Sequence, residues 1–338
     1  MKTVLITGAT GFIGQHLVQA NLDAGHNVEA FVRSKDPGIP QLCEKGVDVL
    51  IGDITNYMAV EHAVNGVDIV YHLAGLPPLW ENYHQFETTH VAGMKNICLA
   101  SLKKSVELLV NVSTCDVFGL KEHILIDESQ EYQYWHQPYP DTKIEAAKIA
   151  REYSRHGLPL TTVYPCHVYG PGDQYFLPHL IEAIQNKNLV FWRKNARIWP
   201  IYVRNLTDFL LTVTHHPAAK GEDFLIHDGQ SETYEHFATQ IAQAMNLAPP
   251  TRHIPYFSAL TAAWFMEKTW NILEKDTTPP LTIYTVKNRG SRLNFSIQKA
   301  QKLLGWNPPI PYEKAFTDTL NNLKNIERAN GRKNEPHP

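Results

Sequence analysis

A tyrosine and a lysine stand four residues apart in the segment Tyr139-Pro140-Asp141-Thr142-Lys143, which opens a helical pattern. Pro140 suits the first position of a helix, so we expect the helix to begin there. The spacing then places Tyr139 and Lys143 on one face, one turn apart. A tyrosine hydroxyl has a free pKa of about 10, and a nearby ammonium lowers it by stabilising the phenolate. The pair indicates acid–base chemistry, although an isolated Y-x-x-x-K is usually a surface tyrosine and a solvated lysine.

A hydroxyl that could hold a substrate follows the fifth expected strand. The segment Asn111-Val112-Ser113-Thr114-Cys115-Asp116-Val117-Phe118-Gly119 leaves the sheet at its carboxyl end, where ligands bind in folds of this kind. A hydroxyl there can donate to a carbonyl oxygen as that oxygen gains charge. The alternative is a serine or threonine that only caps a helix.

Three glycines near the start of the chain indicate a dinucleotide site. The apolar run from Thr3 to Thr7 leads into Gly8-Ala9-Thr10-Gly11-Phe12-Ile13-Gly14, and a helical pattern follows. Gly8 permits a tight turn, Gly11 lets the backbone approach phosphates, and Gly14 lets helix and strand pack closely. A strand, a glycine turn and a helix together place a pyrophosphate on the N-terminus of the helix.

Alternating strands and helices must position these residues. Further strands are expected at 28–32, 47–51, 67–73 and 108–113, with helical patterns between them, which predicts an α/β fold with a doubly wound parallel sheet of the Rossmann type. We expect residues 1–170 to form the dinucleotide-binding domain. Residues 171–328 would form mainly a smaller substrate-binding lobe, with segments such as 201–228 returning to the sheet. Residues 329–338 are expected to be a disordered tail.

Composition narrows the class of protein. The 338 residues carry a net charge of −3, which gives no reason to expect a nucleic-acid partner. The four cysteines and 17 histidines form no metal-ligand spacing, so no metal is assigned. No secretory or membrane-spanning segment is recognised, and a cytoplasmic protein is expected. Two alternatives stay open: a homodimer, and peripheral membrane contact through the aromatic-rich residues 254–272.

Together these motifs resemble the extended short-chain dehydrogenase/reductase superfamily, also called the NAD-dependent epimerase/dehydratase superfamily. Supporting segments are His72-Leu73-Ala74-Gly75, Val168-Tyr169-Gly170-Pro171-Gly172-Asp173 and Leu303-Leu304-Gly305-Trp306-Asn307-Pro308. The resemblance implies that Tyr139 is the acid/base, Lys143 holds the nicotinamide ribose and Thr114, five residues before Gly119, orients the substrate. It also implies that Asp53 meets the adenine.

The resemblance also implies a set of ligand contacts. The expected cofactor contacts are Gly8, Thr10, Gly11, Phe12, Ile13, Gly14, Arg33, Asp53, Ile54, Leu73, Ala74, Gly75, Tyr139, Lys143, Pro165, His167 and Val168. The expected substrate contacts are Cys115, Tyr175 and Phe176.

Three departures refine this picture. The end of the second strand reads Phe31-Val32-Arg33-Ser34, without the acid that often binds the ribose 2′-hydroxyl, and an arginine there favours NADP(H) modestly over NAD(H). His90 stands where the family often has the asparagine of its proton relay. Tyr164-Pro165-Cys166-His167 replaces the epimerase pattern and looks more like the 3β-hydroxysteroid dehydrogenase and dihydroflavonol-reductase branches.

We therefore expect an NAD(P)-dependent oxidoreductase that moves hydride between nicotinamide and a secondary alcohol or ketone. The aromatic and apolar residues expected around the cleft favour a sterol- or flavonoid-like substrate. One alternative is a nucleotide-sugar epimerase or dehydratase, which Arg289 and Arg292 would suit as phosphate ligands. The other is a non-catalytic dinucleotide-binding sensor.

Overall fold

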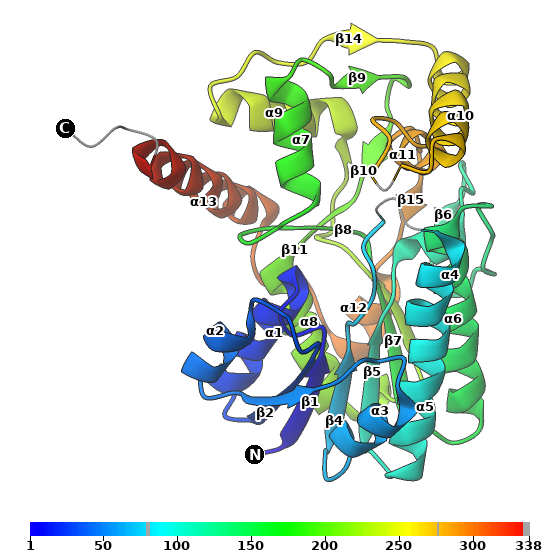
Figure 1. Cartoon of the computed structure of the whole chain (residues 1–338), viewed down its shortest axis with the longest axis vertical. Coiled ribbons are helices and arrows are strands. Elements are labelled where there is room, and N and C mark those ends of the chain that lie inside the picture. Colours follow the sequence, from blue (N-terminus) through cyan, green and yellow to red (C-terminus); the bar gives the residue numbers. More distant parts are fainter. Residues whose placement is uncertain (79–81, 276, 334–338) are drawn as a thin grey trace.

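The computed structural model describes residues 1–78, 82–275 and 277–333. Within these residues, a parallel sheet of seven strands forms the centre of the larger lobe (Figure 1). Its order is β12 (Asp223–Ile226), β7 (Leu160–Pro165), β5 (Leu108–Val112), β4 (Ile69–His72), β1 (Thr3–Thr7), β2 (Asn27–Val32) and β3 (Asp48–Ile51). This order confirms the predicted Rossmann-type sheet, and each of the strands expected from sequence lies within one residue or two of its observed bounds.

Helices cover both faces of the sheet because alternate residues of each strand point to opposite sides. Val4 and Ile6 of β1 share one core with α1 (Phe12–Asp23), α8 (Val203–His215) and α12 (Gln298–Leu304). Leu5 points to the other core, with α3 (Tyr57–Ala63), α5 (Gly93–Lys103) and α6 (Pro138–Arg155). Shorter helices lie in the connections: α2 (Ile39–Glu44), α4 (Tyr83–Phe86), the π-helix η1 (Glu87–Ala92), and the 3₁₀ turns η2 (Cys115–Phe118) and η3 (Pro217–Ala219).

A smaller lobe stands over the carboxyl ends of the strands (Figure 1). Its helices are α7 (Phe176–Gln185), α9 (Tyr234–Ala244), α10 (Tyr256–Ile272), α11 (Ile283–Arg289) and α13 (Tyr312–Lys333). Short strand pairs brace it: β8 (His167–Tyr169) with β11 (Pro200–Tyr202), β9 (Val190–Phe191) with β14 (Arg252–His253), β10 (Arg197–Ile198) with β13 (Glu232–Thr233), and β15 (Asn294–Phe295) with β6 (Leu125–Ile126).

Two expectations from sequence differ from the structure. Helix α6 begins at Pro138, which takes the first helical position, so Pro140 and Tyr139 both lie inside the first turn. Residues 329–333 of the expected tail continue helix α13, and residues 334–338 lie outside the described residues. Among the described residues, no helix combines the length and apolar character needed to cross a bilayer.

Candidate active site

The glycine turn between β1 and α1 forms a close-packed cradle. Gly8 has a φ of +71°, which a side chain rarely adopts, and a Cβ on it would lie 3.0 Å from the backbone of Leu73 and Ala74. A Cβ on Gly14 would lie 2.1 Å from the carbonyl oxygen of Gly8. The chain therefore presents bare backbone at the N-terminus of α1, a geometry that fits a pyrophosphate.

The carboxyl end of β4 closes one side of this cradle. The hydroxyl of Thr7 accepts hydrogen bonds from the backbone amides of Leu73 (3.2 Å) and Ala74 (3.1 Å), and it also bonds Nδ1 of buried His72 (2.9 Å). These bonds fix the turn that leads to Gly75, where a Cβ would come within 3.1 Å of the Lys143 ammonium. The expected contacts Leu73, Ala74 and Gly75 therefore lie between the glycine turn and Lys143.

An acid that the sequence interpretation overlooked lies on the glycine turn. The carboxylate of Asp36 accepts hydrogen bonds from the Thr10 hydroxyl (2.7 Å) and the Gly38 amide (2.9 Å). Arg33 is exposed just beyond the end of β2. Asp36 follows the strand by four residues, so a search confined to the strand end could not find it.

The other expected cofactor residues lie around the same edge of the sheet. Asp53 is exposed after β3, and its carboxylate accepts from the amide and the hydroxyl of Thr55. Ile54 is buried under Gly93 of α5. Two of the other expected contacts lie in the first helix: Ile13 packs against the core that α1 shares with β1, and Phe12 packs against the core of the smaller lobe. Pro165 is the last residue of β7, and Val168 contacts both of these cores.

His167 offers a polar atom to this cleft. Its Nε2 lies 3.4 Å from the amide oxygen of Asn288, and its buried Nδ1 has no hydrogen-bond partner among the described residues. A buried ring nitrogen without a partner costs free energy unless a ligand or water satisfies it. The glycine cradle and this nitrogen together fit a dinucleotide lying across the ends of the strands.

Tyr139, Thr114 and Lys143 lie at the carboxyl edge of the sheet, beyond the ends of β4 and β5. Tyr139 and Lys143 are one turn apart on α6, as expected, and both are half-buried. Thr114 precedes η2, and its hydroxyl oxygen accepts from the Asp116 amide at 3.3 Å, which leaves the hydroxyl proton free to donate. Thr114 lies close enough to the Tyr139 hydroxyl to lower its pKa.

Burial dominates the proton affinities here. Burial raises the pKa of Tyr139 well above its ordinary value, the nearby Asp116 and Cys115 raise it further, and Thr114 lowers it. Lys143 is not among the groups that shift the pKa of Tyr139, so the expected lowering by its ammonium is not found in this structure. Burial lowers the pKa of Lys143 to about 8, so its ammonium and the neutral form are both accessible near neutral pH.

His90 fills the space beside Tyr139 and Lys143. It lies in the π-helix η1, with its ring 5.8 Å from that of Tyr139. Because the Thr142 hydroxyl already donates to the Pro138 carbonyl (2.8 Å), His90 Nδ1 must donate to Thr142, and Nε2 accepts the Leu76 amide (3.0 Å). Burial, with the Lys143 charge, lowers the pKa of His90 to about 2, so the ring is neutral.

A carboxylate and an aromatic pair complete the cleft, and the sequence interpretation assigned none of them. Asp116 is buried behind Thr114 and accepts from the Tyr284 hydroxyl at 2.8 Å. The Tyr284 ring lies edge-on to Tyr139 at 5.8 Å and tilts against Trp135 at 5.6 Å. Asp116 stood inside the quoted motif, but nothing local pointed to a partner on α11.

The expected substrate residues divide into two groups. Cys115 is buried in a core cluster with Cys166, close enough to Tyr139 to affect its charge. Phe176 stacks on Phe237 at 5.8 Å and packs on the core of the smaller lobe, whereas Tyr175 is exposed at the start of α7. Of the three, Cys115 is the one that the structure brings next to Tyr139.

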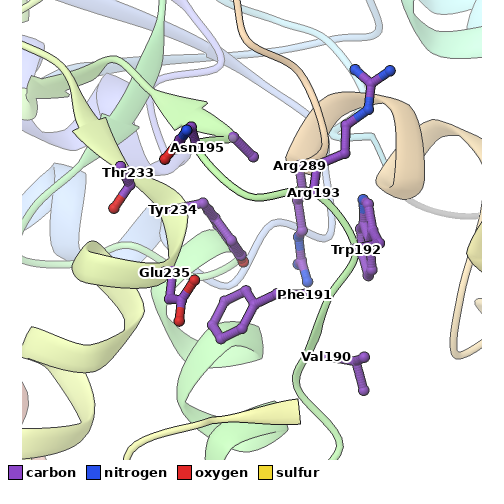
Figure 2. A pocket seen from close by; sticks show the side chains of 10 residues that line it. Val190, Phe191, Trp192, Arg193, Asn195, Thr233, Tyr234, Glu235 and Arg289 are labelled. Carbon is purple, nitrogen blue, oxygen red and sulfur yellow. The ribbon is translucent and has the colours of Figure 1, made fainter. Parts of the chain in front are cut away.

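Two hollows lie in the smaller lobe, away from the glycine turn. Figure 2 shows the first, a cavity of about 10 Å³ lined in part by Phe191, Tyr234 and Arg289, which has room for about one water. The second is an open groove of about 660 Å³ bordered by Glu122, Arg193 and Lys287. Helix α11 contributes to both, with Arg289 and Lys287 respectively. Among the described residues, no group of histidine, cysteine or acidic side chains could hold a metal ion.

Comparisons with known proteins agree with this geometry. A model of the NAD-dependent epimerase/dehydratase family matches residues 4–226. The 2-alkyl-3-oxoalkanoate reductase of Stenotrophomonas maltophilia is 28% identical over 93% of this chain and 97% of its own length. The 3β-hydroxysteroid dehydrogenase/Δ5→4-isomerase of Mycobacterium tuberculosis is 29% identical over 94% and 89%.

The fold recurs in solved structures. The structure of MoeE5 in complex with UDP-glucuronic acid and NAD superposes with a TM-score of 0.75 at 20% identity, over 96% of this chain and 99% of the other. At that identity the likeness concerns the fold alone. The same fold thus carries both oxidoreductases and a protein that binds a nucleotide sugar.

Proposed function

The chain belongs to the NAD-dependent epimerase/dehydratase family, and on that premise we propose that it interconverts a secondary alcohol and a ketone on a hydrophobic small molecule. It is an NAD(P)-dependent oxidoreductase of the extended short-chain type. The observation that carries the proposal is the convergence of Tyr139, Thr114 and Lys143 between the glycine turn and an aromatic wall.

The glycine turn and Lys143 would hold a nicotinamide cofactor, which would supply or accept the hydride when bound. For ketone reduction, the Thr114 hydroxyl donates a hydrogen bond to the carbonyl oxygen, since its own oxygen already accepts the Asp116 amide. The Tyr139 hydroxyl then gives its proton to that oxygen as negative charge develops on it. Lys143, on the same face of α6, binds the ribose and stabilises charge on the phenolate.

The aromatic wall supports a hydrophobic substrate. Half-buried Tyr284 lies beside Tyr139, with buried Trp135 packed against it, and an aromatic ring in this place suits a ring or alkyl chain better than the many hydroxyls of a sugar. The reductase and the steroid dehydrogenase to which the chain is similar act, by their names, on an oxoalkanoate and a steroid. We extend that class of substrate to this chain.

A nucleotide-sugar epimerase is the second candidate, and Arg289 is the observation that favours it. This half-buried guanidinium lies over the Tyr234 ring at 5.6 Å and lines the cavity in Figure 2, which would have to widen to admit a phosphate. The intact Thr114, Tyr139 and Lys143 argue against the third alternative, a non-catalytic sensor.

Ligand-dependent thermal stability separates the two candidates. The purified protein with NAD(P)H is heated alone, with steroid ketones and long-chain 3-oxoacids, or with UDP- and GDP-sugars, and cofactor oxidation is followed by absorbance. We expect the hydrophobic ketones to raise the melting temperature and to be reduced. Stabilisation by a nucleotide sugar alone, without ketone turnover, would establish the epimerase instead.

The finer expectations are proposals as well. Arg33 supports a modest preference for NADP(H), while the neighbouring Asp36 weighs against it. Residence in the cytoplasm and formation of a homodimer stay predictions. So does membrane contact, for which α10 offers exposed Phe257, Phe265 and Ile272.

A further inference from the structure

Asp116 is a buried carboxylate that has no cationic partner among the described residues. Its side chain accepts from the Tyr284 hydroxyl at 2.8 Å and from the Asn288 amide at 3.4 Å, both on α11. None of the ion pairs among the described residues includes it. Burying an unpaired carboxylate costs free energy, and an uncharged residue of the same size would avoid that cost. Stability alone therefore does not account for the charge at this position.

The contacts of Asp116 connect the two lobes next to Tyr139. Tyr284 is 168 residues away in the chain, and its ring lies between Trp135 and Tyr139. Trp135 donates from Nε1 to the backbone oxygen of Asp116 (2.8 Å), and its own carbonyl accepts from the Lys287 ammonium (2.8 Å). Helix α11 is thus fastened to η2 and to the segment before α6.

Other ionisable groups face this carboxylate from each element packed on it. Tyr139 comes from α6, Tyr284 from α11, and Cys115 from η2, with Cys166 behind it. The pKa values of Tyr139, Tyr284 and Cys115 all lie well above their ordinary values, so these three groups are uncharged at neutral pH. The lysine on α11, Lys287, is bonded to the Trp135 carbonyl instead. The contacts through Tyr284 place the Asp116 charge near Tyr139, where it adds to the larger effect of burial on the Tyr139 hydroxyl. A negative neighbour disfavours loss of the phenolic proton.

We propose that Asp116 is a positioning residue that anchors Tyr284 of α11 against Tyr139 and keeps the Tyr139 hydroxyl protonated for donation to the substrate oxygen. The proposal rests on the proposed function, because it assigns the acid/base role to Tyr139. Asp116 itself touches neither substrate nor cofactor in this scheme. It acts through Tyr139 and Tyr284.

The pH profile of alcohol oxidation tests the effect of the charge. Oxidation requires Tyr139 to have lost its proton, so its rate rises with pH. In Asp116→Asn, the pH at which the oxidation rate increases should be about one unit lower than in the wild type, the order expected when one like charge is removed. Tyr284→Phe keeps the charge of Asp116, so the oxidation rate should increase at the same pH as in the wild type, while KM should be higher. An unchanged profile in Asp116→Asn, with only a uniform loss of kcat, would overturn this role.

Hydrogen exchange of the free protein tests the anchor without any turnover. Amides of residues 283–290 should exchange faster in both Asp116→Asn and Tyr284→Phe, and at the wild-type rate in Asp48→Asn, which changes an exposed acid on β3. Unchanged exchange in both active-site variants would overturn the anchor. If the wild type turns over no alcohol or ketone, the proposed function fails, and the exchange measurement still decides whether Asp116 holds α11.

Discussion

Residues from three parts of the chain surround Tyr139. Thr114 lies near it just before η2, Lys143 lies one turn along α6, and the Tyr284 ring of α11 packs edge-on against the Tyr139 ring. Burial keeps the Tyr139 hydroxyl protonated, which suits donation to a carbonyl oxygen. At the residue scale, activity should therefore depend on the hydroxyl and not on the ring that packs around it.

Replacing Tyr139 by phenylalanine tests that dependence. The ring and its contacts remain, so cofactor affinity should barely change. Turnover should fall by about 10²–10⁴, the usual contribution of a positioned acid or base. Steady-state kinetics and cofactor titration measure the two effects separately. Near-normal turnover in this variant would remove Tyr139 from the mechanism.

Cofactor choice is a second property of single residues. Arg33 can bind a 2′-phosphate, and Asp36, fixed on Thr10, repels one. Arg33→Ala should weaken NADP(H) by about tenfold, the order of one hydrogen bond to a charged group, and leave NAD(H) unchanged. Asp36→Asn, which can keep its hydrogen bonds, should strengthen NADP(H).

Dissociation constants of both cofactors for the wild type and the two variants measure this preference. Arg33 would lie outside the site if the wild type bound NADP(H) and NAD(H) equally well. The same would follow if the ratio of the two dissociation constants were unchanged in Arg33→Ala.

Among the elements, the turn between β1 and α1 is the most tightly packed part of the cofactor cleft. The amide of Gly11 donates to the Gly8 carbonyl (3.0 Å), and the same carbonyl leaves no room for a side chain on Gly14. The helix thus starts directly against the strand, and its first free amides face the cleft.

Gly14→Ala should disturb this element. The new methyl would lie 2.1 Å from the Gly8 oxygen, so the helix must move away from the strand, at a cost of about 1–3 kcal/mol. Both thermal stability and cofactor affinity should fall. Gly25→Ala is the control: it has a φ of +76° with open space around it, so it should lower stability by about 1–2 kcal/mol and leave cofactor binding intact. Equal effects of the two variants on cofactor binding would contradict the role of the turn.

For the whole molecule, pH links the site to stability. Burial lowers the pKa of His72 to about 3 and that of His90 to about 2, so both rings are neutral when folded. As pH falls below 6.5 the unfolded chain binds these protons and the folded chain does not, which destabilises the fold by about 2 kcal/mol per histidine at pH 5. Asp116 and Asp228, whose pKa burial raises to about 6, act in the opposite direction between about pH 4 and 6.

Comparison with a variant isolates one histidine. His90→Gln should be less stable than the wild type at pH 7.5, because it loses the hydrogen bonds that the His90 ring makes to Thr142 and Leu76. The difference in unfolding free energy between the two proteins should narrow by pH 5, since the variant has no ring to protonate. Denaturant unfolding at the two pH values measures this, and a constant difference would show that His90 does not titrate on unfolding.

The sequence alone was sufficient for features that depend on short spacings. Four-residue spacing on a helix brings Tyr139 and Lys143 to one face, and the glycine spacing after a strand predicts the turn at Gly8, because helix and strand periodicity are local properties of the backbone. The alternating pattern predicts the parallel sheet for the same reason.

Contacts between distant segments could be known only from the tertiary structure. Asp36 reaches Thr10 across 26 residues, and Asp116 meets Tyr284 across 168. The position of the smaller lobe over the ends of the strands decides which acid is buried against which hydroxyl. That position minimises the free energy of the whole chain and not of any one segment. Within the described residues, that packing leaves Asp116 without a cationic partner and raises the pKa of Tyr139.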